Sequence, residues 1–226
     1  MSTPAKLTVD IWSDIMCPWC VIGYKQLTKA LDGLAGEVEA EVRWHPFELN
    51  PDMPAEGEGM AAHMLRKYGR QPDEASTARM VAMAAEAGYE MRYLGEGEEP
   101  SRNLWNTFLA HKLLHWALTG HGGAVQTRLK LALFDAHFQQ RRNVSDAEVL
   151  LDVAESLGLD RAAAQAALAD DALGEAVRAE ESEARAMEIN AVPAMVINGR
   201  YMIPGAQDAA GYASLLRQVV EREGAA

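Results

Sequence analysis

Cys17-Pro18-Trp19-Cys20 holds the only two cysteines of the 226-residue sequence, and two residues separate them. Two cysteines cannot form a framework of several disulfides, and structural disulfides are rare in the cytosol, which leaves catalysis, metal binding or chance. A zinc site needs further ligands, and the histidines are scattered singly along the chain. We therefore interpret the pair as a reactive centre and expect no metal. Two structural thiols and half of a zinc site remain the alternatives.

The composition is that of an ordinary globular protein with an acidic balance. Apolar residues make up 49% of the chain, and the formal net charge is -12. Nucleic-acid affinity depends on lysine and arginine neutralising phosphates, so we exclude DNA and RNA as partners. No apolar run reaches the roughly 18 to 20 residues needed to cross a bilayer. Residues 1–6 lead into a strand-like segment without a signal-peptide pattern, which predicts a cytoplasmic protein and no membrane partner.

The two cysteines stand between a predicted strand and a predicted helix. Apolar and polar residues alternate over 7–12, and apolar residues recur with helical spacing over 20–34. Pro18 suits the first turn of that helix, where its missing N–H would have no partner. Alternation over 38–49 predicts a second strand. This order makes a βαβ unit, which is normally right-handed with parallel strands.

The middle of the chain is predicted to be helical, and its end is predicted to form two strands and a helix. After Pro54 the sequence predicts helices over 59–68, 73–87, 102–119, 124–140, 146–157, 161–169 and 173–187. Strand character returns over 194–197 and 200–203, with Asn198-Gly199 as the hairpin turn between them. A final helix follows over 207–223. We predict one domain from residues 1–56 and 188–226, and an inserted helical domain from residues 57–187.

This order of elements is α/β and resembles the thioredoxin fold with a large all-helical insertion. Cys-x-x-Cys begins the first helix, and Val192-Pro193 precedes the third strand. With these motifs the whole chain resembles the DsbA family of thiol-disulfide oxidoreductases. It is more narrowly similar to the FrnE-type dithiol-disulfide isomerases. That similarity rests on Cys17-Pro18-Trp19-Cys20, the motif His-Pro-Phe-Glu-Leu-Asn-Pro over 45–51, Asn106-Thr107 followed by Ala110-His111, and Gly205-Ala206-Gln207.

The predicted chemistry places a redox-active disulfide between Cys17 and Cys20. The helix N-terminus presents free N–H groups and a partial positive charge, which should lower the pKa of Cys17. Cys17 is expected at the exposed edge as the attacking thiol, and Cys20, one turn in and more buried, as the resolving thiol. The resemblance implies a cis bond before Pro193. It also implies that Val192 offers its backbone N–H and C=O to an extended substrate.

Two departures from the family pattern stand out. Many thioredoxin-fold enzymes carry a buried carboxylate six residues before the first cysteine, and Ile11 occupies that place here. Strand alternation predicts that Asp10 and Asp14 lie on the opposite face from Ile11, so another group or water must handle the proton. Trp19 replaces the histidine of the strongly oxidising DsbA. Because Trp19 adds no positive charge, we expect the cysteine pair to be a less oxidising couple, suited to reduction or isomerisation.

Further residues are candidates for a substrate cleft. His45 ends the second strand, where ligand sites in open sheets gather, although a histidine bonded structurally into the following loop is the more frequent case. Phe47 belongs to the same motif. Asn106, Thr107 and His111 share one predicted helix and either line the cleft or tie the helix to a loop. Most of the eleven methionines are expected in the core, with an adaptable apolar groove as the alternative.

The leading prediction is a dithiol-disulfide oxidoreductase or isomerase that acts on protein or peptide thiols through a mixed disulfide at Cys17. No bound cofactor is expected, and glutathione is considered as reductant or co-substrate. The resemblance also includes kappa-class glutathione transferases and 2-hydroxychromene-2-carboxylate isomerases. Cys20 counts against that branch, because conjugation needs no resolving thiol. A chaperone-like module that binds apolar peptides is the third alternative, and the sequence leaves the oligomeric state open.

Overall fold

The computed structural model describes residues 3–224. Residues 1 and 2, which open the segment without a signal-peptide pattern, lie outside the described residues. Among the helices within residues 3–224, none has the length and apolar composition that a membrane-spanning helix requires.

A mixed four-stranded sheet forms the centre of the fold. It contains β1 (Ala5–Ser13), β2 (Val38–Pro46), β5 (Ala194–Ile197) and β6 (Tyr201–Pro204) in the order β2-β1-β5-β6. β1 and β2 are parallel, and the other two pairs are antiparallel. Asn198 (φ 51°) and Gly199 (φ 66°) make the left-handed turn between β5 and β6, a conformation that these two residue types tolerate best. The predicted βαβ unit and hairpin are confirmed.

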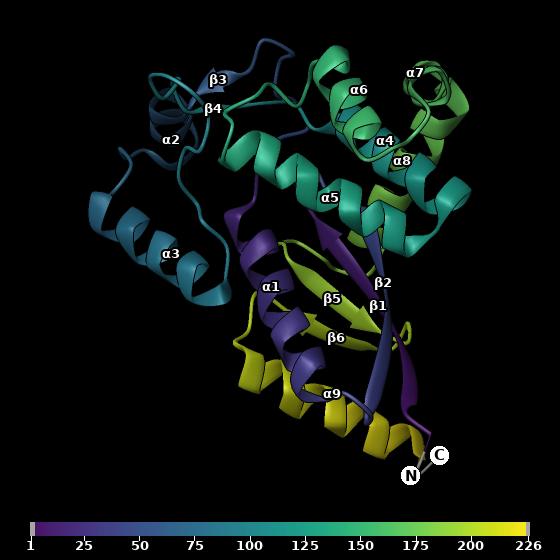
Figure 1. Cartoon of the computed structure of the whole chain (residues 1–226). Helices are drawn as coiled ribbons and strands as arrows, with labels where there is room; N and C mark the ends of the chain where they lie inside the picture. The colour runs from purple at the N-terminus through teal and green to yellow at the C-terminus, as the bar shows by residue number, and fades with distance from the viewer. Residues whose placement is uncertain (1–2, 225–226) are drawn as a thin grey trace.

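Helix α1 (Pro18–Gly33) is the crossover of the βαβ unit and lies beside α9 (Ala209–Gly224), as Figure 1 shows. Gly23 allows this close packing. A Cβ atom at Gly23 would stand 3.2 Å from Cγ of Pro193 and 3.2 Å from the hydroxyl of Tyr212. Because such contacts are tighter than ordinary packing, α1, the loop before β5 and α9 approach one another at a residue without a side chain.

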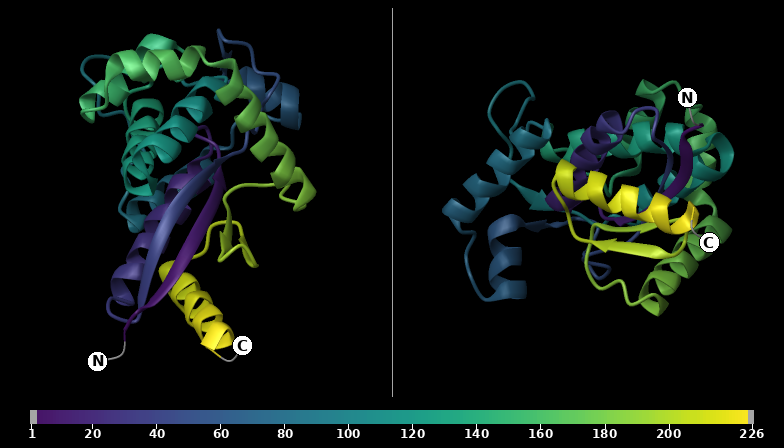
Figure 2. Two further views of the ribbon diagram at one scale, coloured as in Figure 1. Left: turned by 90° about the vertical axis from the view of Figure 1, so that its right-hand side faces the viewer. Right: turned by 90° about the horizontal axis from the view of Figure 1, so that it is seen from below.

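Most helices of the middle of the chain pack at the end of the sheet where β1 and β2 lie (Figures 1 and 2). α4 (Phe108–His121), α5 (Gly123–Phe138) and α8 (Asp171–Ala186) contact β2, while α6 (Ala147–Ser156) and α7 (Arg161–Ala169) pack on α5, on α4 and on each other. α2 (Met60–Tyr68) and α3 (Glu74–Ala87) lie to one side, where α3 contacts α1. The mixed α/β architecture with a helical insertion is confirmed, and the division into two domains stays a prediction.

Most boundaries lie within two residues of the predicted ones, and the largest differences occur in two places. The helix predicted from residue 102 begins at Phe108, because Asn103 and Leu104 form the short strand β4 (Asn103–Leu104) against β3 (Glu58–Gly59). Asn106 then accepts a hydrogen bond from the Phe108 N–H (2.9 Å) where the helix starts. The second strand ends at Pro46, three residues before its predicted end. Strands of two residues are too short to produce an alternating pattern in the sequence.

Candidate dithiol active site

Cys17 and Cys20 are free thiols at the start of α1. Cys17 is the N-cap residue in an extended conformation, and the N–H of Cys20 donates to its carbonyl at 3.1 Å. Cys20 is completely buried, as predicted. The predicted exposure of Cys17 is wrong, because only 4% of this residue is accessible. The loop before β5 covers it, and the Cys17 thiol donates to the carbonyl of Val192 at 3.5 Å.

The environment separates the two thiols by acidity. A hydrogen bond from the Cys20 thiol lowers the pKa of Cys17, and the N–H groups of Cys20 and Trp19 act in the same direction against the cost of burial. Burial raises the pKa of Cys20 well above its usual value, and the neighbouring Cys17 sulfur raises it further. The thiolate therefore belongs on Cys17, and Cys20 holds its proton in the dithiol state.

The loop that covers Cys17 contains a cis peptide bond between Val192 and Pro193. The Pro193 carbonyl accepts a hydrogen bond from the Gly205 N–H at 2.8 Å, which connects this loop to the residue after β6. Trp19, next to the thiols, is 38% exposed. It gives the rim of the site a large apolar side chain without a charge.

Asp14 lies in the turn between β1 and the cysteines, and its side chain is buried. The carboxylate accepts hydrogen bonds from the Leu49 N–H (2.7 Å) and the Met16 N–H (3.2 Å). Burial raises its pKa in spite of these donors. Its negative charge acts against a thiolate on Cys17, so a buried carboxylate does influence the thiols, although it is not at the place of Ile11. β1 ends at Ser13, and alternation does not continue through the turn.

Two of the three candidate residues near the start of α4 are directed to Asp14. Thr107 acts to lower the pKa of Asp14, and Nε2 of His111 lies 4.0 Å from Oδ1 of Asp14. Burial lowers the pKa of His111 well below its usual value, so this imidazole is neutral. Asn106 instead ties the helix start to a loop, since its amide donates to the Met53 carbonyl at 3.0 Å.

The hydrogen bonds of His45 are to residues other than the thiols. His45 extends from the sheet face covered by α8, where Nε2 lies 2.9 Å from Asp10 and Nδ1 lies 2.6 Å from Glu180. Burial opposes its charge, but these two carboxylates outweigh burial and raise the pKa of His45 to about 9. The ring of Trp12 stacks on the imidazole at 4.5 Å. Phe47 packs against the hydrophobic core.

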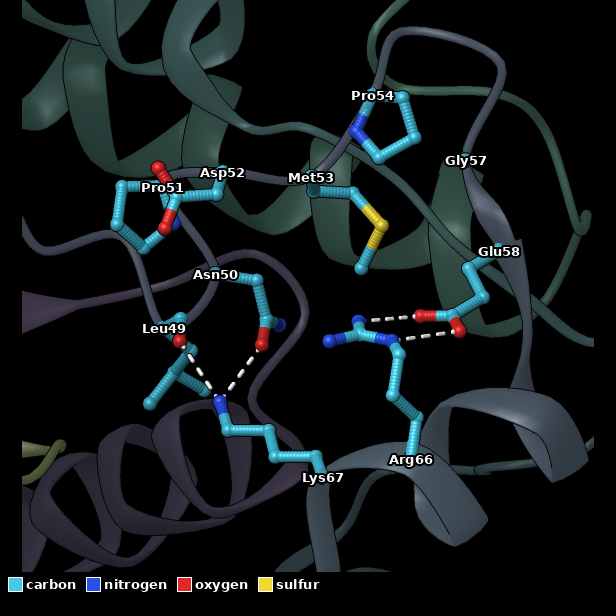
Figure 3. Close-up of a pocket in the computed structure, with 10 residues that line it drawn as sticks. All are labelled: Leu49, Asn50, Pro51, Asp52, Met53, Pro54, Gly57, Glu58, Arg66 and Lys67. Carbon is cyan, nitrogen blue, oxygen red and sulfur yellow. Dashed lines mark hydrogen bonds and ion pairs between the residues drawn. The ribbon is translucent and has the colours of Figure 1, made fainter.

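A cavity of about 450 Å³ lies between the loop after β2 and α2 (Figure 3). On one wall of the cavity, the Lys67 ammonium donates hydrogen bonds to the Leu49 carbonyl (2.9 Å) and to the Asn50 side-chain oxygen (2.6 Å). Arg66 closes another side with two hydrogen bonds to Glu58 (2.9 and 2.6 Å). Because the Leu49 N–H also binds Asp14, this wall continues into the thiol site.

The side chains support the predicted core role of most methionines over the alternative of an apolar groove. Met53 and Met91 are buried, and Met60 and Met80 pack against the core. Met83 is the exposed member, at 46%.

The sequence analysis missed Lys130 on α5. This residue is 0% exposed, and its ammonium group has no hydrogen-bond partner among residues 3–224. Burial lowers the pKa of Lys130 to about 8, while the charges of Cys20 and Asp14 pull it upward. A signal was present in the sequence, because Lys130 falls on the apolar stripe formed by Leu129, Leu133 and Phe134.

The sequence matches the DSBA-like thioredoxin domain family over residues 8–217. A probable DsbA oxidoreductase of Streptomyces coelicolor is 31% identical, with a TM-score of 0.82 over 94% of this chain and 89% of that chain. The uncharacterized protein YwbO of Bacillus subtilis is 30% identical over 203 residues, which cover 88% of this chain and 90% of the relative.

Two structures of lower identity share the fold. The cytosolic disulfide reductase DsbM from Pseudomonas aeruginosa, solved with GSH, is 19% identical with a TM-score of 0.62, over 95% of this chain and 99% of that chain. A 2-hydroxychromene-2-carboxylate isomerase is 15% identical with a TM-score of 0.67, over 96% and 98% of the two chains. At these identities the likeness concerns the fold alone.

Proposed function

Because the chain belongs to the DSBA-like thioredoxin domain family of oxidoreductases, we propose that it reduces or isomerises disulfides of proteins or peptides through Cys17 and Cys20. The observation that carries this proposal is the opposite acidity of two thiols at one helix start. Cys17 has a lowered pKa and Cys20 a raised one. This is the division that an attacking and a resolving thiol require.

The reaction proceeds in two exchanges. The Cys17 thiolate attacks one sulfur of a substrate disulfide, that disulfide breaks, and the leaving sulfur departs as a thiolate that takes up a proton. Cys20 then loses its proton and attacks Cys17, which forms the Cys17–Cys20 disulfide and releases the second substrate thiol. Two electrons pass from the protein to the substrate, and an external thiol such as glutathione must restore the dithiol. In isomerisation the substrate's own thiol attacks the mixed disulfide instead.

The surroundings favour reduction or isomerisation over strong oxidation. Trp19 places an apolar ring beside the thiolate and adds no positive charge of its own there. Val192, whose carbonyl already meets the Cys17 thiol, is proposed to pair with an extended substrate. We also propose that the protein works in the reducing cytoplasm and belongs to the FrnE-type subgroup. Both proposals agree with reduction or isomerisation.

Replacement of Cys17 tests the proposal. Reduction of insulin disulfides by dithiothreitol should be accelerated by the wild type and not by Cys17→Ser. Cys20→Ser is the matched variant. It should still form a mixed disulfide with a disulfide-containing peptide, and mass spectrometry should detect that adduct because the resolving thiol is absent. Full reductase activity of Cys17→Ser would refute the proposal.

A glutathione-dependent transferase or isomerase is the second candidate, because a Cys17 thiolate could serve that chemistry without Cys20. The Cys20→Ser variant distinguishes the two functions. Turnover of an electrophilic glutathione acceptor that persists in this variant, with no disulfide exchange by the wild type, would identify the transferase branch. A chaperone-like module would instead suppress aggregation of a denatured client equally well in the wild type and in Cys17→Ser/Cys20→Ser.

A further inference from the structure

Lys130 is a buried cation for which the proposed reaction, as written above, has no role. Its ammonium nitrogen lies 5.4 Å from the ring centroid of Trp44 and 5.1 Å from that of Phe134. These aromatic faces recover part of the lost hydration. An ammonium group without a hydrogen-bond partner is nevertheless expensive to bury, so its presence inside the core calls for a function.

The position of Lys130 is fixed by the way α5 docks on β2. The side chain of Gln126 accepts from the Trp44 N–H (2.9 Å) and donates to the Trp44 carbonyl (2.7 Å). Thr127 accepts from the Trp44 indole at 3.0 Å. Gly123 fits against the strand, since a Cβ there would stand 2.5 Å from the Val42 carbonyl oxygen. Lys130 follows Gln126 by four residues and therefore lies on the same helix face.

The docking of α5 places Lys130 beside the helix that carries the thiols. Its ammonium lies over the ring of Trp44, and Trp44 also packs on Tyr24 of α1 at 5.0 Å, one helical turn after Cys20. Burial lowers the pKa of Lys130, while the charges of Cys20, Asp14 and Cys17 act to raise it. The other titratable groups around this cluster are Tyr212 from α9, whose pKa the Cys20 charge raises, and the neutral His111 from α4, on which Lys130 and Arg178 act.

Cys20 needs such help at one step. Once a substrate is joined to Cys17, the Cys17 thiolate no longer exists, and Cys20 must become the nucleophile although it is completely buried. A desolvated thiol loses its proton reluctantly. Ile11 occupies the place of the carboxylate that assists this step in many proteins of the same fold.

We propose that Lys130 is the positioning residue whose charge stabilises the Cys20 thiolate during resolution of the mixed disulfide. The proposal rests on the function proposed above. The Cys20 S–H bond breaks and its proton passes to water. The Cys20 thiolate attacks Cys17, the bond between Cys17 and the substrate sulfur breaks, and the substrate leaves as a thiolate. That thiolate finally takes up a proton from water.

The test measures the two exchanges separately. The reduced protein is mixed with glutathione disulfide, and samples quenched over time are analysed by mass spectrometry for the glutathione adduct and for the Cys17–Cys20 disulfide. In Lys130→Met we expect resolution at pH 7 to slow about tenfold and the adduct to accumulate, since one unit in the pKa of Cys20 changes its thiolate fraction tenfold. The deficit should shrink as the pH rises, and adduct formation should change much less.

Lys112 provides the matched control. It is also a buried lysine of the inserted helices, but its ammonium donates to the Leu168 carbonyl at 2.8 Å. Lys112→Met should leave both exchange rates unchanged. If Lys130→Met does not fold, the comparison uses Lys130→Arg, which should keep the rate of resolution, and Lys130→Gln, which should lose it.

Two results would overturn the proposal, and they differ from failure of the proposed function. Resolution in Lys130→Met with the wild-type rate and pH profile would make Lys130 a packed core cation only. Equal rates in Lys130→Arg and Lys130→Gln would lead to the same conclusion. In both cases the wild type still forms and resolves the adduct. A wild type that forms no adduct at all would instead refute the function and this inference together.

Discussion

Two clusters of buried polar side chains beside the sheet differ in their hydrogen bonding. In the satisfied cluster, on the α8 face, His45 is held between Asp10 and Glu180, and Glu180 also binds His115. In the unsatisfied cluster, the ammonium of Lys130 and Nε2 of His111 have no hydrogen-bond partner within residues 3–224. The contrast concerns these side chains and not whole faces of the sheet, because Nε1 of Trp12, which stacks on His45, also has no partner within those residues.

This difference separates a stabilising network from a reactive one. A histidine between two carboxylates gains free energy from its charge, because its pKa rises on folding. A lysine without a partner loses free energy, because its pKa falls on folding. Buried polar groups in folded proteins are normally paired, and violations of that rule concentrate at functional sites. The unsatisfied cluster is the one that surrounds Cys20.

The largest expected effect concerns the satisfied cluster. His45→Gln should lower the free energy of unfolding by about 3 kcal/mol at pH 6, since a rise from 6.5 to about 9 corresponds to 1.36 kcal/mol per pKa unit. The loss should be fully present below pH 6.5 and should fade as the pH rises through 9. Urea denaturation of both proteins at several pH values measures the difference. A pH-independent difference would mean that His45 is not charged in the folded protein.

A smaller effect of opposite sign is expected for the unsatisfied cluster. Lys130→Met should raise the free energy of unfolding by about 2 kcal/mol at pH 7, because a well-packed apolar side chain replaces a desolvated charge. The lysine is penalised below its folded pKa of about 8, so the gain should shrink as the pH rises from 8 towards 10. Chemical denaturation of the two proteins provides the measurement. Strong destabilisation by Lys130→Met would mean that the lysine is structural.

The smallest effect concerns two aspartates, Asp10, which binds His45, and Asp14, which is buried in the turn before Cys17. Asp14→Asn should lower the pKa of Cys17, because the negative charge of Asp14 opposes the thiolate. Asp10→Asn should leave Cys17 unchanged, since Asp10 faces His45. The pH dependence of Cys17 alkylation by iodoacetamide, measured with Cys20→Ser as the background, reports both. Equal shifts in the two variants would show that the sheet does not separate the clusters electrostatically.

The sequence predicted the parts of the fold that depend on local pattern. Alternation placed β1, helical spacing placed α1, and Asn198-Gly199 placed the hairpin, because each signal is complete within a few neighbouring residues. The short pair β3 and β4 was missed for the opposite reason. Two residues give no period, and their pairing joins segments far apart in the chain.

The chemistry of the site was predictable only in part. The Cys-x-x-Cys spacing at a helix start identified the thiols, and their relative burial followed from the helical turn. The covering of Cys17 by Val192 depends on a contact across 175 residues of chain. Strand alternation could not place Asp14, because β1 ends at Ser13. Lys130 was visible as a charge on an apolar stripe, but nothing local shows that this stripe faces Cys20.

The docking of Gln126 on Trp44 has a consequence beyond the placement of Lys130. β2 is an outer strand of the sheet, and an outer strand exposes backbone groups that can pair with another chain. By occupying both the N–H and the carbonyl of Trp44, Gln126 blocks the register that a foreign strand would need. An extended polypeptide that the proposed reaction brings to this protein therefore finds no free backbone partner at Trp44.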